Sequence, residues 1–226
     1  MKNLVFCSTS IKSKPTPELF GKDREFDVCL HYYDAPEDYI GVEELIEWVE
    51  PKGVWHWYQQ GEKLEVAFDV IPHLPAYSQY AFLDDDLTVS TGQLNQLFRI
   101  GDSLGLPLYQ PALTTNSYSS HSHLYQSIGR EVYPVRKVPF VEIMCPFFSW
   151  AALSLCLPTF NRNISAWGLD LYVWPLLVDG YVIDSLAIGH MRMPGRRDRV
   201  LRNGLTPMEE CAKLKEEVDR EGRIGA

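Results

Sequence analysis

The sequence predicts a single α/β domain. Three observations predict it: short apolar runs end in polar loops, segments with apolar residues at helical spacing alternate with those runs, and one run ends in three consecutive carboxylates. The chain has 226 residues and is 46% hydrophobic, which is enough for one substantial core. We expect residues 1–200 to form the domain and residues 201–226 to form a C-terminal helical tail.

Charge and cysteine content exclude several classes of protein. The 21 basic and 30 acidic residues give a net charge of −9, whereas nucleic-acid binding requires clustered Lys and Arg. The densest basic cluster, Arg196, Arg197 and Arg199, would meet a diphosphate or an anionic membrane, or form a solvated loop. Five cysteines, odd in number and mostly set in apolar runs, indicate reduced thiols rather than disulfides or a zinc site.

The apolar segments argue against membrane insertion. The N-terminal segment 1–8 has one lysine and too short an apolar stretch for a signal peptide. The most apolar region, Ile143–Pro158, is interrupted by a proline and two serines and falls short of the ~20 residues that span a bilayer. We therefore expect a cytoplasmic protein without a transmembrane segment.

Two strands are expected early in the chain, at Leu4–Cys7 and Phe26–Tyr32. The polar loops after them contain Ser8, Lys12 and Asp34. In α/β sheets ligands bind at the carboxyl ends of strands, so these loops are candidate nucleotide contacts. The chain has no Gly-x-Gly-x-x-Gly motif after the first strand and no Walker lysine motif, which disfavours dinucleotide oxidoreductases and P-loop phosphotransferases.

The segment Tyr80–Asp86 reads as a buried strand that ends in Asp84, Asp85 and Asp86. In an extended segment the first and third of these acids point to one side and the second to the other. Carboxylates held that close repel each other unless a cation such as Mg²⁺ or Mn²⁺ lies between them. The alternative is an acidic turn, with Asp86 or Ser90 capping the next helix.

Helical spacing of apolar residues predicts two helices between Val42 and Val70, and Lys63 lies near the amino end of the second. A lysine there would bridge a phosphate as a point charge, or else be solvated. Trp55 and Trp57 are expected in the core. A further helix is predicted from Thr91 to about Ser103, with a stop signal at residues 105–107.

The middle of the chain predicts a strand at Pro107–Leu113 that contains Gln110, then a loop at Asn116–Ser122. A second strand is predicted at Phe140–Pro146, with Glu142 in an otherwise apolar run. Burying an unpaired carboxylate costs several kcal/mol, so Glu142 should face a polar cleft or hold a salt-bridge partner.

A helix is predicted at Phe148–Leu157 and a loop at Asn161–Ser165. Asp170 would then lie at the start of a helix, where backbone N–H groups favour its charged form, with Trp167 beside it as a flat apolar face. A helix-capping role is the alternative for this aspartate.

The last strand is predicted at Tyr181–Ile188, with His190 just after it. A neutral imidazole is a common third ligand where two carboxylates hold a metal, although most histidines that follow a strand are structural. Thr206, Pro207 and Glu209 form a helix-capping box. The helix that follows carries Cys211, Leu214 and Val218 on one side, so it should pack on the domain or mediate association.

Taken together, these segments resemble a GT-A type glycosyltransferase, in which an Asp-x-Asp motif ends a strand, a later strand brings another acid, and a C-terminal histidine completes a metal site. More narrowly, they are similar to an uncharacterised family abundant in plants. The matching pieces run in order between Leu4 and Gly195: residues 10–14, 30–34, Lys63, 82–87, 110–113, 141–149, 166–170, 189–190 and 194–195. The plant members typically have Asp-Glu-Asp where this chain has three aspartates, and their N-terminal membrane anchor is not expected here.

The resemblance implies a GT-A-like nucleotide-binding domain with a mixed central sheet flanked by helices, and a transferase that moves sugar from a nucleotide donor to an acceptor hydroxyl. It implies Mn²⁺ or Mg²⁺ as cofactor and a glycan or lipid-linked acceptor. By position, the expected metal ligands are Asp84, Asp86 and His190, and the expected nucleotide-sugar contacts are Ser8, Lys12, Asp34, Lys63, Asp84, Asp85, Gln110 and Arg192. Trp167 would bind the acceptor.

Asp170 is the expected catalytic base of an inverting reaction. Glu142 is the reserve candidate for the catalytic carboxylate: in a retaining reaction it would lie close beneath the anomeric carbon. Other classes stay open at this point: a nucleotidyltransferase or nucleotide-sugar hydrolase with the same metal chemistry, or a binding module without turnover. The sequence does not specify the sugar, the base or the oligomeric state.

Overall fold

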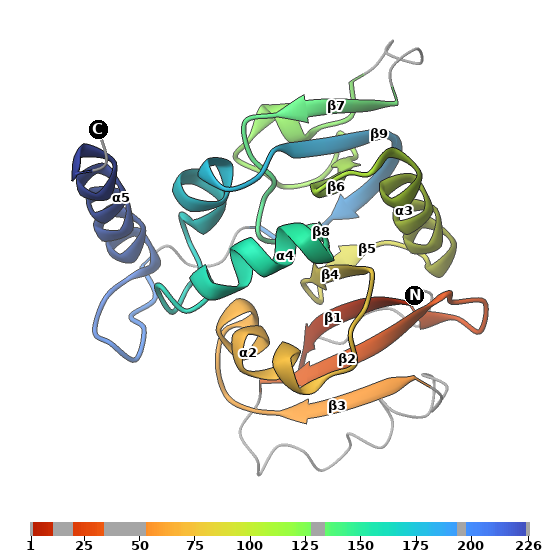
Figure 1. Ribbon diagram of the computed structural model, residues 1–226, viewed down its shortest axis with the longest axis horizontal. Coiled ribbons are helices and arrows are strands. Elements are labelled where there is room, and N and C mark those ends of the chain that lie inside the picture. The colour runs from red at the N-terminus through yellow and green to blue at the C-terminus, as the bar shows by residue number, and fades with distance from the viewer. Residues whose placement is uncertain (1, 11–19, 34–52, 128–133, 194–197, 225–226) are drawn as a thin grey trace.

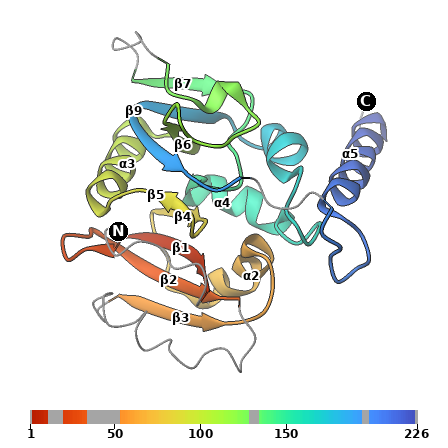
Figure 2. The same ribbon diagram turned by 180° about the vertical axis from the view of Figure 1, so that it is seen from behind.

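The computed structural model describes residues 2–10, 20–33, 53–127, 134–193 and 198–224 (Figure 1). Among these residues, nine strands form one mixed sheet in the order β3-β2-β1-β4-β8-β6-β9-β5, with β7 paired to β9. The strands are β1 (Asn3–Thr9), β2 (Phe26–Tyr32), β3 (Val54–Tyr58), β4 (Gln79–Leu83), β5 (Leu87–Thr88), β6 (Leu108–Leu113), β7 (Val135–Val138), β8 (Phe147–Ser149) and β9 (Gly180–His190). Helices α2 (Lys63–Val70), α3 (Thr91–Leu104), α4 (Trp150–Cys156) and α5 (Pro207–Ile224) lie around it (Figures 1 and 2). The predicted mixed sheet flanked by helices is confirmed.

Strand directions bring distant segments to one edge of the sheet. β1 is parallel to β2 and β4. β8 is antiparallel to both β4 and β6, and β6 is parallel to β9. It follows that β9 runs in the same direction as β1, β2 and β4, so these four strands end at the same edge. Ligand sites form at such an edge, because loops converge there without blocking the hydrogen-bonded ladder.

Two segments between Phe140 and Leu157 differ from the prediction. Residues 140–146 are not a strand: Cys145 N–H donates to the Glu142 carbonyl in a turn, and Pro146 has no N–H to donate. The Pro146 carbonyl of this segment still accepts a hydrogen bond from Phe82 of β4, and the Met144 carbonyl accepts one from Asp84 just after β4. The strand is instead β8, and α4 begins at Trp150 rather than at Phe148.

Strands β3, β5 and β7 were not predicted. β3 has the aromatic sequence Val-Trp-His-Trp-Tyr, and it pairs with β2. Because β3 has a described partner on one side only, Trp55 remains 39% exposed, contrary to its expected core position, whereas Trp57 is half-buried and packs against the core. The other predicted helix between Val42 and Val70, before α2, falls largely outside the described residues.

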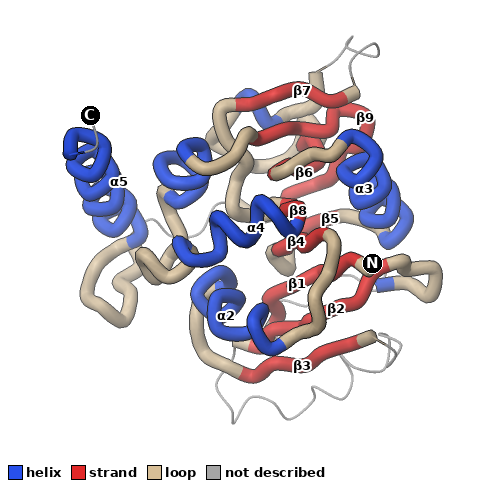
Figure 3. The backbone as a smooth tube through the Cα atoms, viewed as in Figure 1, coloured by secondary structure: helices blue, strands red, loops and turns tan. Residues whose placement is uncertain are grey.

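The helix boundaries follow their capping residues. Ser90 accepts a hydrogen bond from Gln93 N–H at the start of α3, and Gly105 ends this helix in the left-handed region at φ 61°. At the start of α5, Thr206 and Glu209 exchange the hydrogen bonds of the predicted capping box. α5 lies at the periphery of the molecule (Figure 3), with Leu214 buried on its inner side.

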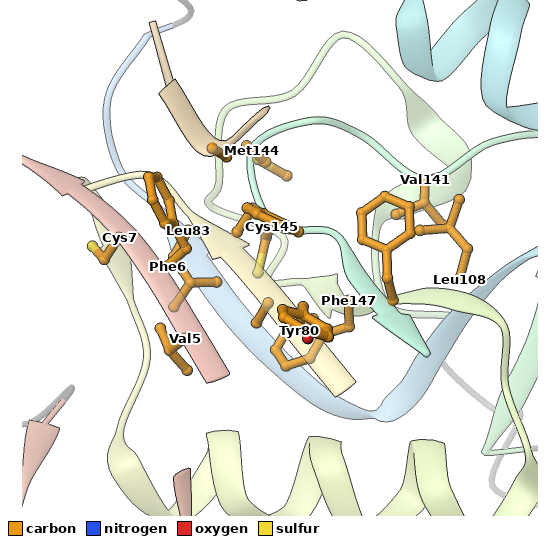
Figure 4. Close-up of a cluster of buried hydrophobic side chains, with 14 of the residues drawn as sticks. Val5, Phe6, Cys7, Tyr80, Leu83, Leu108, Val141, Met144, Cys145 and Phe147 are labelled. Carbon is orange, nitrogen blue, oxygen red and sulfur yellow. The ribbon is translucent and has the colours of Figure 1, made fainter. Parts of the chain in front are cut away.

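One part of the core lies around β1, β4 and β8, where Phe6, Leu83, Cys145 and Phe147 belong to one cluster of buried side chains (Figure 4). All five cysteines are free thiols, as expected, and four of them are buried. Within the described residues, no helix combines the length and apolar character needed to cross a bilayer.

Candidate active site

A cleft of about 870 Å³ opens at the edge where β1, β4 and β9 end. Its floor contains Ser8 from β1, the three aspartates after β4, and His190 from β9. The turn at residues 142–144 and the segment 165–172 form further parts of the lining, together with Met208, Cys211, Ala212 and Lys215 of α5. Residues far apart in the chain therefore share one cavity of the size that small ligands occupy.

Asp86 and His190 face each other across the floor, with His190 Nε2 lying 3.6 Å from Asp86 Oδ1. This Asp86 oxygen is buried and has no hydrogen-bond partner. His190 Nδ1 lies 2.6 Å from the Tyr118 carbonyl and donates to it, which leaves Nε2 directed toward the carboxylate. Burial lowers the pKa of His190, but Asp86 and the Tyr118 carbonyl raise it more, so the net shift is upward. Burial raises the pKa of Asp86, and the combined effects of His190 and Arg192 bring it below its ordinary value.

Asp84 does not join this pair. Its Oδ1 lies 2.5 Å from Lys63 Nζ, in an ion pair between the end of β4 and the start of α2. Burial raises the pKa of Asp84, and the Lys63 ammonium opposes that rise. The expected role of Asp84 as a metal ligand is therefore not favoured by this arrangement.

Lys63 was expected to contact the phosphates, but its ammonium is already surrounded by protein acceptors. Besides Asp84 it donates to the carbonyls of Ile143 at 2.7 Å, and of Phe82 and Met144 at 3.3 Å each. An ammonium has three protons, so these four acceptors use its full hydrogen-bonding capacity. Lys63 fastens the 142–144 turn to β4 and is not a free phosphate ligand.

Asp85 and Arg192 lie next to each other in the lining of the cleft. Asp85 Oδ2 accepts a hydrogen bond of 2.8 Å from the Tyr33 hydroxyl, whose residue follows β2. Arg192 is half-exposed and lies 3.6 Å from Asp85 and 3.7 Å from Asp86. Asp85 and Asp86 therefore share Arg192, whereas Asp84 pairs with Lys63, and residues 85 and 86 form a turn rather than continuing the extended strand.

Glu142 and Asp170 lie together on another wall of the cleft. Glu142 accepts a hydrogen bond from Ser119 at 3.3 Å, and burial followed by repulsion from Asp170 raises its pKa to about 7. Asp170 accepts from Ile143 N–H at 3.2 Å and is 5% exposed. Backbone N–H groups do favour its charged form, as expected, but burial outweighs them and raises its pKa to about 6. Both carboxyl groups thus titrate near neutral pH, as a general base requires.

The segment before Asp170 has a constrained backbone. Ala166 lies in the left-handed region at φ 62°, and Gly168 has φ 90°. A side chain at Gly168 would place its Cβ 3.1 Å from Cys211 Sγ of α5. A residue with a side chain would be strained there, so glycine allows the turn to lie close to α5, and the half-buried Trp167 of this turn lines the cleft.

Gln110 does not have the position expected of a nucleotide-sugar contact. Its side chain is 0% exposed, and it does not line the cleft. Its Oε1 accepts a hydrogen bond of 2.7 Å from Glu142 N–H, so Gln110 holds the 142–144 turn from behind instead of contacting a ligand. Of the other expected nucleotide contacts, Ser8, Asp85 and Arg192 do line the cleft, whereas Lys12 and Asp34 lie outside the described residues.

Several lining residues were missed by the sequence analysis. Tyr33 follows β2 in the same way as Asp34, a position that could have identified it. The apolar stripe of α5 predicted packing, but no pattern indicated that Met208, Cys211 and Ala212 would also line the cleft.

The residues of the floor fit a divalent cation with two protein ligands. The described residues contain no group of three or more His, Cys, Asp and Glu side chains placed to hold a metal. The Asp86 oxygen that has no hydrogen-bond partner and the facing His190 nitrogen are an oxygen and a nitrogen donor that would suit Mn²⁺. The Tyr118 carbonyl fixes the imidazole in the manner of an outer-shell partner.

Comparison with solved structures identifies the fold. No protein-family model and no curated protein sequence matches the chain. The structure of GalNAc-T7 with UDP, GalNAc and Mn²⁺ matches with a TM-score of 0.70 at 9% identity, covering 96% of this chain and 48% of that one. S. aureus TarS 1–349 in complex with UDP-GlcNAc matches with a TM-score of 0.56 at 12% identity, covering 87% and 60%. S. aureus TarS matches with a TM-score of 0.54 at 13% identity, covering 83% of this chain and 36% of that one. The chain thus spans about a third to three fifths of these proteins, and it has the GT-A-type fold of these glycosyltransferases.

Proposed function

We propose that this protein is a glycosyltransferase that moves a sugar from a nucleotide-sugar donor to an acceptor hydroxyl with the help of Mn²⁺ or Mg²⁺. The observation that carries the proposal is the unpartnered Asp86 oxygen facing His190 Nε2, on the floor of a cleft at the carboxyl edge of a GT-A-type sheet. Two neighbours with this fold support it: the structure of TarS 1–349 is a complex with UDP-GlcNAc, and the structure of GalNAc-T7 contains UDP, GalNAc and Mn²⁺.

In this proposal Asp86 and His190 hold the cation. When bound, the cation neutralises the charge that develops on the leaving diphosphate. Arg192, beside Asp85 and Asp86, adds positive charge to the cleft. The Asp85 carboxylate meets the ribose hydroxyls, and Lys63 holds the surrounding turn in place.

Asp170 is the proposed base that takes the proton of the acceptor hydroxyl, which makes the reaction inverting. Its place in the same cleft as Trp167 favours it, because the acceptor would lie against the indole ring and the apolar residues of α5. Glu142 remains the alternative acid residue, acting beneath the anomeric carbon in a retaining reaction. We also propose that residues 1–200 carry the donor site and that α5 completes the acceptor side.

The test is titration calorimetry of UDP and UDP-GlcNAc with and without Mn²⁺. We expect Mn²⁺-dependent binding that is lost in Asp86→Asn and His190→Ala. Asp102→Asn makes the same carboxylate-to-amide change on the exposed surface of α3 and should bind like wild type. Nucleotide binding that ignores both Mn²⁺ and the two site substitutions would contradict the proposed site.

Product analysis separates the alternative reactions. Transfer releases nucleoside diphosphate together with a glycosylated acceptor, whereas a hydrolase releases free sugar and a nucleotidyltransferase consumes or forms pyrophosphate. Binding without any product after incubation with an acceptor panel would indicate a binding module.

A further inference from the structure

A buried histidine lies behind Ser8, on the side away from the cleft. β1 and β2 are parallel, and their register places Ser8 directly beside His31. The His31 side chain is 0% exposed and bridges two groups: its Nδ1 lies 2.9 Å from Ser8 Oγ, and its Nε2 lies 2.8 Å from the Gln59 carbonyl oxygen. No part of the catalytic scheme above uses this histidine.

The two contacts determine where each proton lies. A carbonyl oxygen can only accept, so His31 Nε2 must carry a proton and donate it to Gln59. Burial also lowers the pKa of His31 to about 4, which keeps the ring neutral at physiological pH. A neutral ring has one N–H, so Nδ1 is an acceptor, and the Ser8 hydroxyl donates its only O–H to it.

Ser8 is therefore left with lone pairs only. Its side chain lines the cleft, where a serine with a free proton could either donate or accept. Because the Ser8 O–H already donates to His31, Ser8 can bind only a ligand group that donates a hydrogen bond. Phosphate oxygens are acceptors and are disfavoured next to it.

Two neighbouring groups, Tyr33 and Asp85, have the same polarity, whereas Arg192 lies 3.6 Å from Asp85 as a donor. The Tyr33 hydroxyl donates its proton to Asp85 Oδ2, and the Asp85 carboxylate itself can only accept. This end of the cleft therefore matches the donor-bearing half of a nucleotide, which has base N–H groups and ribose hydroxyls, rather than its diphosphate.

We propose that Ser8, oriented by the buried His31, selects the donor nucleotide by accepting a hydrogen bond from its nucleoside half, either a base N–H or a ribose hydroxyl. Ser8 is the specificity-determining residue, and His31 is a positioning residue that never touches the ligand. This inference rests on the proposed function, because it assumes that a nucleotide occupies the cleft.

The experiment measures binding of UDP, N3-methyl-UDP, 2′-deoxy-UDP and 3′-deoxy-UDP, each with Mn²⁺, by titration calorimetry. In wild type we expect UDP to bind about three- to tenfold more tightly than the analogue that lacks the proton donated to Ser8. The analogue whose loss of affinity disappears in Ser8→Ala identifies the contact: N3-methyl-UDP for the base, or a deoxy analogue for the ribose. A loss caused by a missing Asp85 contact would persist in Ser8→Ala.

Variants connect the preference to the two residues. Ser8→Ala should bind UDP as weakly as wild type binds the sensitive analogue, and should show no further loss with that analogue. His31→Asn keeps an acceptor amide oxygen near the Nδ1 position and should retain the preference, whereas His31→Phe, if its unfolding temperature shows a folded protein, should lose it. A merely structural histidine would not change the ratio of UDP to analogue affinity.

The outcomes distinguish the two proposals. If wild type binds UDP but binds all three analogues within twofold of it, the role of Ser8 is overturned while the proposed function stands. The role of Ser8 would also be overturned if the loss of affinity caused by Ser8→Ala and the loss caused by the analogue were additive. If UDP does not bind wild type at all, the proposed function fails, and this inference fails with it.

Discussion

At the scale of single residues, the chemistry depends on how burial tunes two carboxyl groups. Glu142 and Asp170 lie near enough for their charges to interact, and their pKa values rise to about 7 and about 6. Because the groups interact, their protons come off in two steps that belong to the pair. Asp170, with the lower value and a backbone N–H donor from Ile143, is the more fully ionised of the two at pH 7 and so the more available as a base.

We predict a pH profile of transfer that follows from this pair. A base must be ionised, so kcat should fall as the pH decreases through about 7 to about 6, rather than near pH 4 where an ordinary aspartate titrates. Asp170→Asn should reduce kcat by about 10²- to 10⁴-fold and leave the Kd of UDP unchanged, as measured by steady-state kinetics and calorimetry. Equal turnover in Asp170→Asn would transfer the role of base to Glu142.

At the scale of elements, the fit between α3 and β6 depends on one glycine. A Cβ at Gly101 would lie 2.2 Å from the hydroxyl oxygen of Tyr109. Tyr109 cannot move aside easily, because its ring is fully buried and its hydroxyl donates a hydrogen bond of 2.5 Å to Gln79. This contact fixes the distance of α3 from the sheet and hence the path of the chain between the aspartates and β6.

We predict that Gly101→Ala lowers the free energy of unfolding by about 1–3 kcal/mol through overpacking. Gly92→Ala is the matched control on the same helix: its Cβ would meet only the Ser90 side chain at 4.0 Å, so the substitution should be neutral or slightly stabilising. Chemical denaturation of both variants is the measurement. Equal stability of the two would show that the helix can shift away from β6.

The same elements show what the sequence could predict. Strands β1, β2 and β9 and helix α3 have apolar patterns with clear boundaries, and all four lie where they were expected. The apolar run 140–146 was wrongly taken as a strand, because apolar character predicts burial but not whether the backbone pairs regularly. Strands β5 and β7 are too short to show a period.

The candidate site was predictable to the same extent. Asp86 and His190 were found because each follows or ends a strand at the same edge of the sheet. The engagement of Lys63 with three carbonyls, and of Gln110 with a backbone N–H, could not be predicted, since those partners are brought together only by folding. The role of His31 has the same origin, because its partners lie on β1 and just after β3.

At the scale of the whole molecule, α5 is joined to the segment that carries Trp167 by one buried carboxylate. Glu210 is 3% exposed and accepts hydrogen bonds from the backbone N–H groups of Ile164 and Ser165 at 3.1 and 2.8 Å, and from the Asn203 amide at 2.7 Å. Burial raises the pKa of Glu210, but these donors together bring it below its ordinary value. The helix therefore positions the Trp167 turn as well as covering it.

We predict that Glu210→Ala lowers the free energy of unfolding by about 1–3 kcal/mol, because it leaves buried N–H groups without an acceptor. Because the folded-state pKa is depressed, the stabilising effect of Glu210 is present above the unfolded-state value of about 4.3 and is lost as the pH falls through the folded-state value. The difference in unfolding temperature between wild type and variant should therefore shrink in acid. The exposed Glu216→Ala on the same helix should show no such difference at any pH.

The catalytic consequence of Glu210→Ala separates the two halves of the cleft. Ser8 and His190 lie on strands and Asp86 lies in the turn between β4 and β5, whereas Trp167 depends on the segment that Glu210 holds. Glu210→Ala should thus raise the KM for the acceptor and leave the Kd of UDP with Mn²⁺ within about twofold of wild type. A parallel loss of UDP affinity would mean that α5 supports the donor half as well, and that the two binding regions do not respond independently.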